Sequence, residues 1–321
     1  MMTIIVVIAV ILVVITASQL LKLAELRAKS KGELIYELTQ KENKMQGLLL
    51  LLFFFAFMGF FVWQIVAWGD RILPVSASEH GEDTDFLMSL TLYIITPVFI
   101  ITNALLFWFS YKYAYDPKRK ALFFSHSNKL EMVWTIAPAL VLTVLILMGL
   151  NNWNKITTPI AQEEEHILIE LTAMQFNWTA RYAGEDKKLG RSHVTLIEGV
   201  NGTGVDTLDP SSKDDKIVKG EFHLPVGVPV QFVFRSLDVI HSAFFPHFRS
   251  QMNCVPGVVT QFNFVPSRTT VEMRDITNNE DFNYILLCNK ICGAAHYNMQ
   301  MDIIVESQED YDIWLAEQKG L

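Results

Sequence analysis

Four side chains that bind soft metal ions lie close together near the carboxyl end of the sequence. Cys288 and Cys292 are four positions apart, His296 follows four later, and Met299 three after that. Thiolate, imidazole and thioether groups make a ligand set that suits copper. A Cys-x3-Cys pair alone would equally suit zinc, a disulfide or chance, but methionine is a poor zinc ligand and a common axial copper ligand. The segment therefore predicts a copper-binding loop.

A second stretch supplies another candidate ligand. An apolar run at positions 284–287 leads straight into Cys288, so the loop is expected to begin where a strand ends. A similar run at 228–234 precedes Ser236-Leu-Asp-Val-Ile-His241-Ser, and Cys254-Val-Pro-Gly257 follows. We expect His241 to join the site from the end of this other strand. Cys254 is expected to be a buried thiol, since free cysteine behaves as a small hydrophobe.

Together the two stretches resemble subunit II of the haem-copper cytochrome c oxidases. That family carries D-V-x-H-S, x-V-P-G and C-x-E-x-C-G-x-x-H-x-x-M, and the resemblance covers about positions 85–314. It implies a dinuclear copper centre, CuA, with two bridging sulfurs. It implies these ligands: Cys288 and Cys292 as bridges, His241 and Met299 on one copper, and His296 and the backbone carbonyl of Lys290 on the other.

Two positions depart from the family pattern. Lys290 replaces the usual glutamate, whose side chain reaches a magnesium or manganese ion shared with subunit I; because an ammonium group cannot bind a cation, that magnesium site is in doubt. Phe176, in Gln175-Phe-Asn-Trp178, replaces the tryptophan through which electrons usually arrive. Trp178 matches the second aromatic position of the family, and its alternative role is core packing. The change at Phe176 is compatible with a different donor, such as a cytochrome held within a respiratory supercomplex.

The resemblance implies subunit II of an aa3-type oxidase. Such a subunit takes electrons from a c-type cytochrome and passes them to haem in subunit I, where oxygen is reduced to water and protons are pumped. Haem is expected only in partner subunits, and the sequence has no Cys-x-x-Cys-His motif for covalent haem. Two alternatives stay open: the CuA subunit of a nitric oxide reductase, and a membrane-anchored copper-binding protein.

Composition divides the chain in two. Hydrophobic residues make up 51% of the sequence, which predicts a membrane portion. Positions 1–151 hold 12 of the 26 basic and 11 of the 34 acidic residues, so the remainder is strongly acidic. That balance argues against nucleic acid and is compatible with a basic protein partner.

Four apolar segments, at about 3–21, 47–68, 86–111 and 132–150, are each long enough to cross a bilayer. The first lacks a basic leader and a clear cleavage pattern, so we expect it to be retained as a helix. The loops after the first and third segments are rich in Lys and Arg, whereas the loop after the second is acidic. The positive-inside rule then predicts a multi-pass protein with both basic loops in the cytoplasm and both termini on the outer face. The resemblance implies a bacterial cytoplasmic membrane with the copper domain on its outer face.

Glu131 begins the fourth segment in Glu-Met-Val-Trp134-Thr. By position alone an acidic residue in a first helical turn interacts favourably with the helix dipole. The family carries E-x-x-W-T here, and the resemblance implies that Glu131 lies at the mouth of a proton-uptake path into subunit I.

Short alternating runs after position 153 predict a β-sandwich or barrel, and the resemblance implies a cupredoxin-like Greek-key sandwich. Strands are expected at 166–174, 177–182, 221–224, 228–234, 258–264, 269–273, 284–287 and 300–305. The segment 184–219 is expected to be a solvated loop, not a calcium site, because it lacks EF-hand spacing. The expected organisation is a first helix and cytoplasmic loop (1–46), a second helix and outer loop (47–84), a transmembrane hairpin (85–152), the copper domain (153–306) and a capped terminal helix (307–321).

Overall fold

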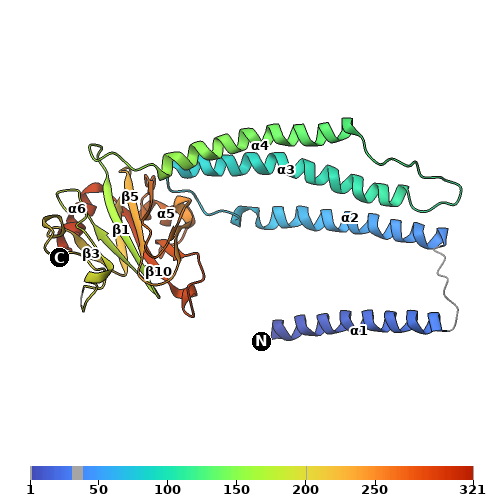
Figure 1. Cartoon of the computed structure of the whole chain (residues 1–321), viewed down its shortest axis with the longest axis horizontal. Coiled ribbons are helices and arrows are strands. Elements are labelled where there is room, and N and C mark those ends of the chain that lie inside the picture. Colours follow the sequence, from blue (N-terminus) through green and yellow to red (C-terminus); the bar gives the residue numbers. More distant parts are fainter. Residues whose placement is uncertain (1, 31–38, 200, 321) are drawn as a thin grey trace. The chain divides into compact units, whose positions relative to one another are not determined.

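The computed structural model describes residues 2–30, 39–199 and 201–320, and Figure 1 shows its elements. The residues form two compact units, Met1–Ile65 with Phe99–Phe124, and Val66–Val98 with Ser125–Leu321. The first unit holds α1, most of α2 and the second half of α3; the second holds the start of α3, α4 and a β domain. The α-helices are α1 Met2–Ser30, α2 Gln40–Trp68, α3 Glu79–Lys112, α4 Asn128–Thr157, α5 Thr270–Thr277 and α6 Gln308–Glu317.

Three helices in the described part of the chain are long and apolar enough to cross a membrane, over Gln40–Arg71, Glu79–Lys112 and Asn128–Thr157. They contain the second, third and fourth predicted segments. The first segment forms the helix α1, but its role as a fourth span stays a prediction. Lys31 and the middle of the first basic loop lie outside the described residues.

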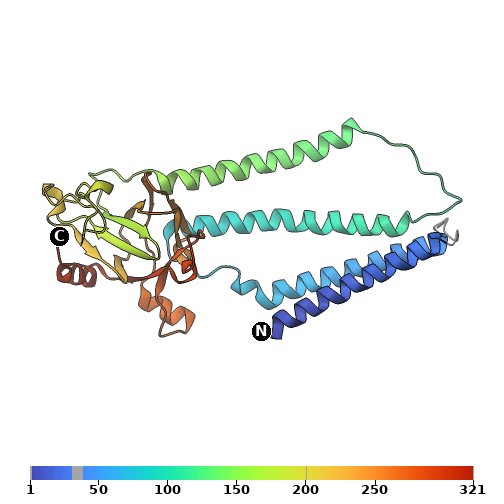
Figure 2. The ribbon, with the colours of Figure 1, turned by 60° about the horizontal axis from the view of Figure 1, so that its bottom comes forward.

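The start of α3 and the end of α4 lie beside the β domain, as Figure 2 shows. Near the start of α3, Asp85 receives two hydrogen bonds from the Arg249 guanidinium, at 2.7 and 2.9 Å. Main-chain bonds from Ala77 to His247 and from Glu79 to Val265 hold the preceding segment. Because these contacts combine backbone and charge-assisted bonds, the start of α3 is held firmly against the β domain within the second unit.

The β domain is a sandwich of two five-stranded sheets. Their orders are β3-β2-β1-β5-β8 and β4-β10-β9-β6-β7. Most neighbours are antiparallel, but β1 pairs with β5 and β4 with β10 in parallel. The strands are β1 Ile167–Met174, β2 Asn177–Tyr182, β3 Lys216–Val218, β4 Glu221–Pro225, β5 Val230–Ser236, β6 His241–Phe245, β7 Ser250–Cys254, β8 Thr260–Phe264, β9 Tyr284–Cys288 and β10 Gln300–Glu306. The 3-10 turns are η1 Gly69–Arg71, η2 Val194–Leu196, η3 Pro210–Ser212, η4 Pro246–Phe248 and η5 His296–Asn298.

An aromatic core joins the two sheets. Phe232 on β5 lies with its ring centroid 6.1 Å from that of Phe222 on β4 and 5.2 Å from that of Phe245 on β6. Alternate residues of β5 and β9 are buried, which is the period-two pattern of a strand with one face on the core. Of the sandwich or barrel predicted from short alternating runs, the structure has the sandwich, and its core gives the strand ends a fixed support.

One predicted strand is wrong. Positions 269–273 lie at the start of helix α5, although Thr269, Thr270 and Val271 are β-branched. Thr269 caps the helix: its hydroxyl accepts a bond from the Glu272 N–H, and the Glu272 carboxylate accepts one from the Thr269 N–H. This reciprocal cap satisfies two helix donors and outweighs the local strand preference. Strands β3, β6 and β7 were not predicted, whereas the terminal helix, capped by Ser307, is confirmed as α6.

The segment 184–219 is also more structured than predicted. Arg181 and Asp215 form a buried ion pair at 2.7 Å, and the Arg191 guanidinium lies 3.1 Å from both Asp206 and Asp209. These carboxylates therefore bind arginines within the loop. The prediction of a solvated loop holds for its exposed turns and is wrong for its base, where Arg181 and Asp215 are almost fully buried.

Candidate metal centre

Adjacent strands of one sheet hold the predicted ligands. β9 ends at Cys288, β6 begins at His241, and the antiparallel pairing of these strands places Ala243 opposite Cys288. His241 was expected at the end of β5; it is instead the first residue of the next strand. Two main-chain bonds fix the cysteine loop, from the Cys288 N–H to the Met299 carbonyl (3.0 Å) and from the Asn289 N–H to the Ser242 carbonyl (2.9 Å).

All six predicted ligand groups meet at this point. The two sulfurs of Cys288 and Cys292 are 3.8 Å apart. The Cys288 sulfur lies 3.8 Å from His241 Nδ1 and 3.3 Å from the Lys290 carbonyl oxygen. The Cys292 sulfur lies 3.6 Å from His296 Nδ1 and 3.8 Å from the Met299 sulfur.

These separations fit donors that share metal ions. Two donors bound tetrahedrally at 2.0–2.3 Å to one ion lie about 3.3–3.8 Å apart. A disulfide needs sulfurs at about 2.05 Å, and Cys288, Cys292 and Cys254 are all free cysteines. One imidazole nitrogen and two sulfurs, from His241, Cys288 and Cys292, lie within 4.8 Å of one another in a buried group. The donor set is soft and sulfur-rich, as copper prefers.

Asp238 orients the His241 ring. His241 Nε2 lies 2.8 Å from an Asp238 carboxylate oxygen, while its Nδ1 faces Cys288. Asp238 also accepts bonds from the Gln175 and Val239 N–H groups, both at 2.7 Å. Burial alone would raise the pKa of Asp238, but these N–H groups and His241 more than offset burial and lower it. Asp238 is therefore a carboxylate that holds His241 with one nitrogen toward the sulfurs.

The β1–β2 turn closes over the cysteine loop. The Gln175 side-chain amide donates to the Cys292 carbonyl. Gly293 has a φ of +143°, and a methyl group there would lie 2.8 Å from Phe176 Cζ. Phe176 is half-buried against this loop, while Trp178 is buried with its ring centroid 6.3 Å from that of His241, edge to face. Both aromatic residues singled out in the sequence thus lie beside the candidate site.

Cys254 is confirmed as a buried thiol. It lies opposite His241 on β7 and is fully buried. Burial raises the pKa of this thiol to about 12, so it stays protonated and weakly reactive. Burial and the neighbouring Cys288 sulfur raise the pKa of Cys292 to about 11 in the same structure. Metal binding at Cys292 must therefore displace a proton.

The remaining predicted site residues lie elsewhere. Lys290 is exposed, so its side chain points away from the buried sulfurs while its carbonyl faces Cys288. Glu131 lies in the first turn of α4, whose far end joins the β domain. With 1.5 Å per residue, Glu131 is about 39 Å along the helix from Thr157, so it lies far from the metal-binding loop.

Two supporting residues were not predicted. Asp238 lies three positions before His241, so a carboxylate close to a candidate histidine was a visible signal. Gln175 lies far from Cys292 in sequence, and no local pattern marks their contact.

Comparison with known families identifies both parts of the chain. The transmembrane domain of cytochrome c oxidase subunit II matches residues 63–151, and the periplasmic domain of the same subunit matches residues 167–308. An alternative cytochrome c oxidase subunit 2 of Bradyrhizobium diazoefficiens is 32% identical over 236 residues, covering 73% of this chain and 80% of the relative. A cytochrome c oxidase subunit 2 of Cereibacter sphaeroides is 26% identical over 259 residues, covering 76% and 79%.

Among solved structures, the periplasmic domain of subunit II of a Bradyrhizobium japonicum cytochrome oxidase aligns with 49% of this chain and 95% of its own length. The identity is 19% and the TM-score 0.32.

Proposed function

Because the chain belongs to the cytochrome c oxidase subunit II family, we propose that it is the electron-accepting subunit of an aa3-type oxidase and binds a dinuclear CuA centre. When bound, the centre accepts electrons one at a time from a c-type cytochrome and passes them to haem in subunit I, where oxygen is reduced and protons are pumped. The chain's own residues bind the metals, orient the ligands and present the surface that the donor meets.

The arrangement of donors around the two sulfurs carries the proposal. The ligands implied for one copper are His241 and Met299, and those for the other are His296 and the Lys290 carbonyl. The Cys288 sulfur lies beside His241 of the first pair and the Lys290 carbonyl of the second. The Cys292 sulfur lies beside Met299 of the first pair and His296 of the second. A sulfur that bridges two metals must approach ligands of both. A single tetrahedral ion would leave two of the six donors unused.

A rigid scaffold suits electron transfer. His241 begins β6, Cys288 ends β9, and Met299 immediately precedes β10, so paired strands of one sheet support ligands from both stretches. Main-chain bonds from Cys288 and Asn289 hold the loop, and Asp238 holds His241. Ligands fixed in this way move little when the charge of the site changes.

Exposed apolar side chains on the cysteine loop supply a surface for protein contact. Ile291, which directly precedes Cys292, is 87% exposed, and Tyr297, which directly follows His296, is 86% exposed. Exposed apolar groups of this kind mark interaction sites. We assign this rim and the adjoining Phe176 to contact with the donor or with subunit I, and Trp178 to the support of His241. The donor is free in solution or held in a supercomplex.

We place the protein in a bacterial cytoplasmic membrane with the copper domain on the outer face. Three apolar helices and the match to a periplasmic domain support this placement. Glu131 then lies at the inner face, where it would take up protons for subunit I. A Glu131→Gln variant should slow proton uptake and leave the copper spectrum unchanged; unaltered turnover would remove this role.

The magnesium site of the family is not proposed for this chain. Lys290 is exposed and carries an ammonium group, which cannot bind a cation. The copper role of its carbonyl survives because that role needs only the backbone. Metal density bonded to a carboxylate of this chain at the subunit I interface would contradict this view.

Two buried cysteines provide the matched test. In the purified complex, Cys288→Ser should lose copper and slow electron transfer from reduced cytochrome c to haem, because serine removes a shared thiolate. Cys254→Ser alters a buried thiol on the adjacent strand β7 and should keep both properties. Equal copper loss in the two variants, or none in either, would contradict the proposal. A copper-delivery protein would instead surrender its copper to an acceptor and would not reduce haem.

A further inference from the structure

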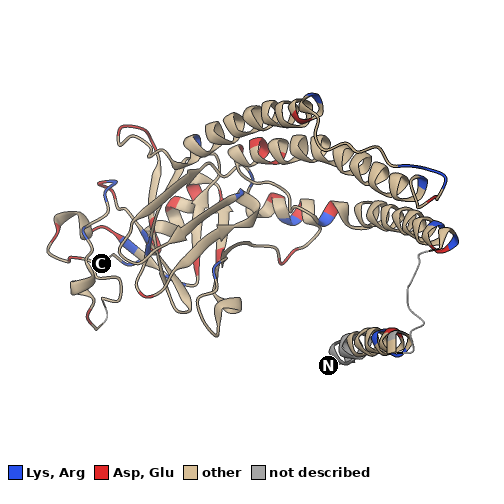
Figure 3. Ribbon diagram, turned by 45° about the vertical axis from the view of Figure 1, so that its right-hand side comes forward, with Lys and Arg blue, Asp and Glu red and all other residues tan. Residues whose placement is uncertain are grey.

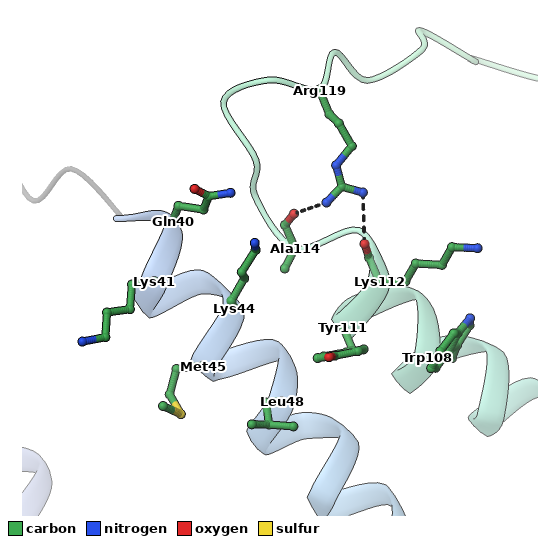
Figure 4. A pocket seen from close by; sticks show the side chains of 10 residues that line it. All are labelled: Gln40, Lys41, Lys44, Met45, Leu48, Trp108, Tyr111, Lys112, Ala114 and Arg119. Atoms are coloured by element: carbon green, nitrogen blue, oxygen red, sulfur yellow. Dashed lines mark hydrogen bonds between the residues drawn. The ribbon is translucent and has the colours of Figure 1, made fainter.

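A basic cavity lies within the first unit, between the amino-terminal end of α2 and the carboxyl-terminal end of α3. Its volume is about 780 Å³, and it is lined by the first turns of α2, the last turns of α3 and the segment that follows α3. Figure 4 shows Lys44 directed into the space between the two helices, below Arg119. The cavity takes no part in the copper chemistry.

Close packing of the helices fixes its base. A methyl group on Gly47 of α2 would lie 3.1 Å from the Tyr111 Cα and 3.2 Å from the Ser110 carbonyl oxygen of α3. The backbones therefore approach closely at this glycine, as small residues allow in membrane helices. On the open side, the Tyr115 N–H donates to the Asn43 side-chain carbonyl at 2.8 Å, which ties the segment after α3 to α2. The cavity is therefore a formed feature of this unit.

Its polar lining is cationic. Lys41, Lys44, Lys112 and Arg119 line it, and no Asp or Glu does so among the described residues. Arg119 donates to the carbonyls of Lys112 and Ala114 at 3.1 and 3.2 Å and so caps the end of α3. Within the described part of the chain Lys44 has no hydrogen bond or ion pair with another side chain. Figure 3 shows the basic residues at these helix ends in blue. Arg119 Nε also lies 3.4 Å from the Asp116 carboxylate. The three lysines, for which the described residues provide no ion pair, are therefore the positive charges open to an anionic ligand.

Its remaining lining is apolar and aromatic. Met45 and Leu48 lie below Lys44 on α2, and Trp108 and Tyr111 lie on α3. Met45, Leu48 and Trp108 are 50%, 38% and 46% exposed. Aromatic rings and basic side chains at the end of a membrane helix mark the headgroup level of a bilayer. An occupant would therefore have an anionic head beside Lys44 and an apolar body along α2 and α3.

We propose that this cavity binds the headgroup of an anionic phospholipid, with Lys44 nearest the phosphate, Lys41 and Lys112 at the rim, and Arg119 bounding the site from the segment after α3. Basic pockets between membrane helices on the cytoplasmic side bind such headgroups. A free phosphate would satisfy the charge but would leave the apolar wall of Met45 and Leu48 without a partner. The bound lipid would fasten α2 to α3 at the inner face.

The test uses the full-length chain, stripped of lipid in a mild detergent and titrated under native mass spectrometry. Phosphatidylglycerol is the anionic probe, phosphatidylcholine the neutral control and inorganic phosphate the headgroup alone. Phosphatidylglycerol should bind at least about tenfold more tightly than phosphatidylcholine, and phosphate should not displace it at equal concentration. Neutralising one lysine should lower the affinity for phosphatidylglycerol about fivefold. We therefore expect a loss of about fivefold in Lys44→Gln and in Lys41→Gln, and of about 25-fold in the double variant.

Two controls complete the design. Lys44→Arg keeps the charge and should restore binding, and Lys129→Gln removes an exposed lysine of α4 outside the cavity and should leave affinity unchanged. Circular dichroism verifies that each variant keeps its helices. If Lys44→Gln does not fold, the affinity of Lys41→Gln, which alters the rim of the cavity, tests the proposal. Equal binding of the two lipids, displacement by phosphate, or the same affinity loss in Lys129→Gln would overturn the proposal. None of these readouts depends on copper.

Discussion

The Asp238 carboxylate lies 2.8 Å from Nε2 of His241, on the side of the ring opposite the Cys288 sulfur. One imidazole nitrogen is thus committed to a carboxylate and the other is free for a metal. In metal sites this contact fixes the ring orientation and increases the ligand's basicity.

Loss of the Asp238 charge should weaken copper binding. Asp238→Asn keeps the size of the side chain but removes the charge that holds His241, and we expect copper affinity to fall by about 10–100-fold. Titration against a copper chelator measures this loss. Asp312→Asn removes the same charge from an exposed position on α6 and should have no effect. Equal affinities in both variants would show that Asp238 does not support the ligand.

A side chain at Gly293 should disturb the cysteine loop. Gly293→Ala places a methyl group 2.8 Å from Phe176 Cζ at a φ of +143°. We expect a loss of about 1–3 kcal/mol in the free energy of unfolding, and reduced copper retention, because strain and steric overlap both act there. Gly220→Ala is the control, since its φ is +90° and the added methyl meets no atom within 4 Å. A Gly293 variant that loses no more stability than the control would contradict the close contact.

His247 should make the β domain less stable in acid. Its ring lies edge to face against Phe282 and Tyr284, and burial, with the charge of Arg249, lowers its pKa to about 4. An unfolded histidine binds a proton below about pH 6.5, so the unfolded state binds more protons between pH 6.5 and 4. The contribution of His247 to the free energy of unfolding should therefore be constant above about pH 6.5. It should fall as the pH decreases from about 6.5 to about 4. Because His247 is partly exposed, we reduce the expected effect for solvent screening. The loss in the free energy of unfolding at pH 4.5 is then on the order of 1–2 kcal/mol.

The comparison of variants isolates this effect from the titration of carboxylates. His247→Leu should flatten the pH dependence of urea unfolding, followed by the β-sheet circular dichroism of the full chain. His193→Gln, at an exposed histidine, should keep the wild-type slope. Parallel curves for wild type and His247→Leu would show that His247 does not couple folding to pH.

The candidate donors could be found in the sequence because four of them are close together and chemically unusual. The spacing of Cys288, Cys292, His296 and Met299 predicts a copper site before any fold is known, and the structure brings these groups together. The supporting contacts could not be predicted in the same way. Gln175 reaches Cys292 only because the sandwich brings the β1–β2 turn over the cysteine loop.

The secondary structure was predictable where one pattern dominated. Long apolar runs gave the positions of α2, α3 and α4, and alternation gave β1, β2 and β9. Helix α5 was missed because its β-branched residues favour a strand. The cap formed by Thr269 and Glu272 stabilises the helix instead. Strand β7 was missed because Ser250-Gln-Met-Asn-Cys254 has few strand-forming residues; its pairing with β6 defines it.

The most direct test of the account is the copper content of the purified, fully loaded protein, measured together with its electron paramagnetic resonance spectrum. Two copper atoms per chain, with one unpaired electron shared equally between them, are predicted by the paired sulfurs of Cys288 and Cys292. One copper per chain, or zinc in its place, would contradict the proposed centre and the respiratory function that depends on it.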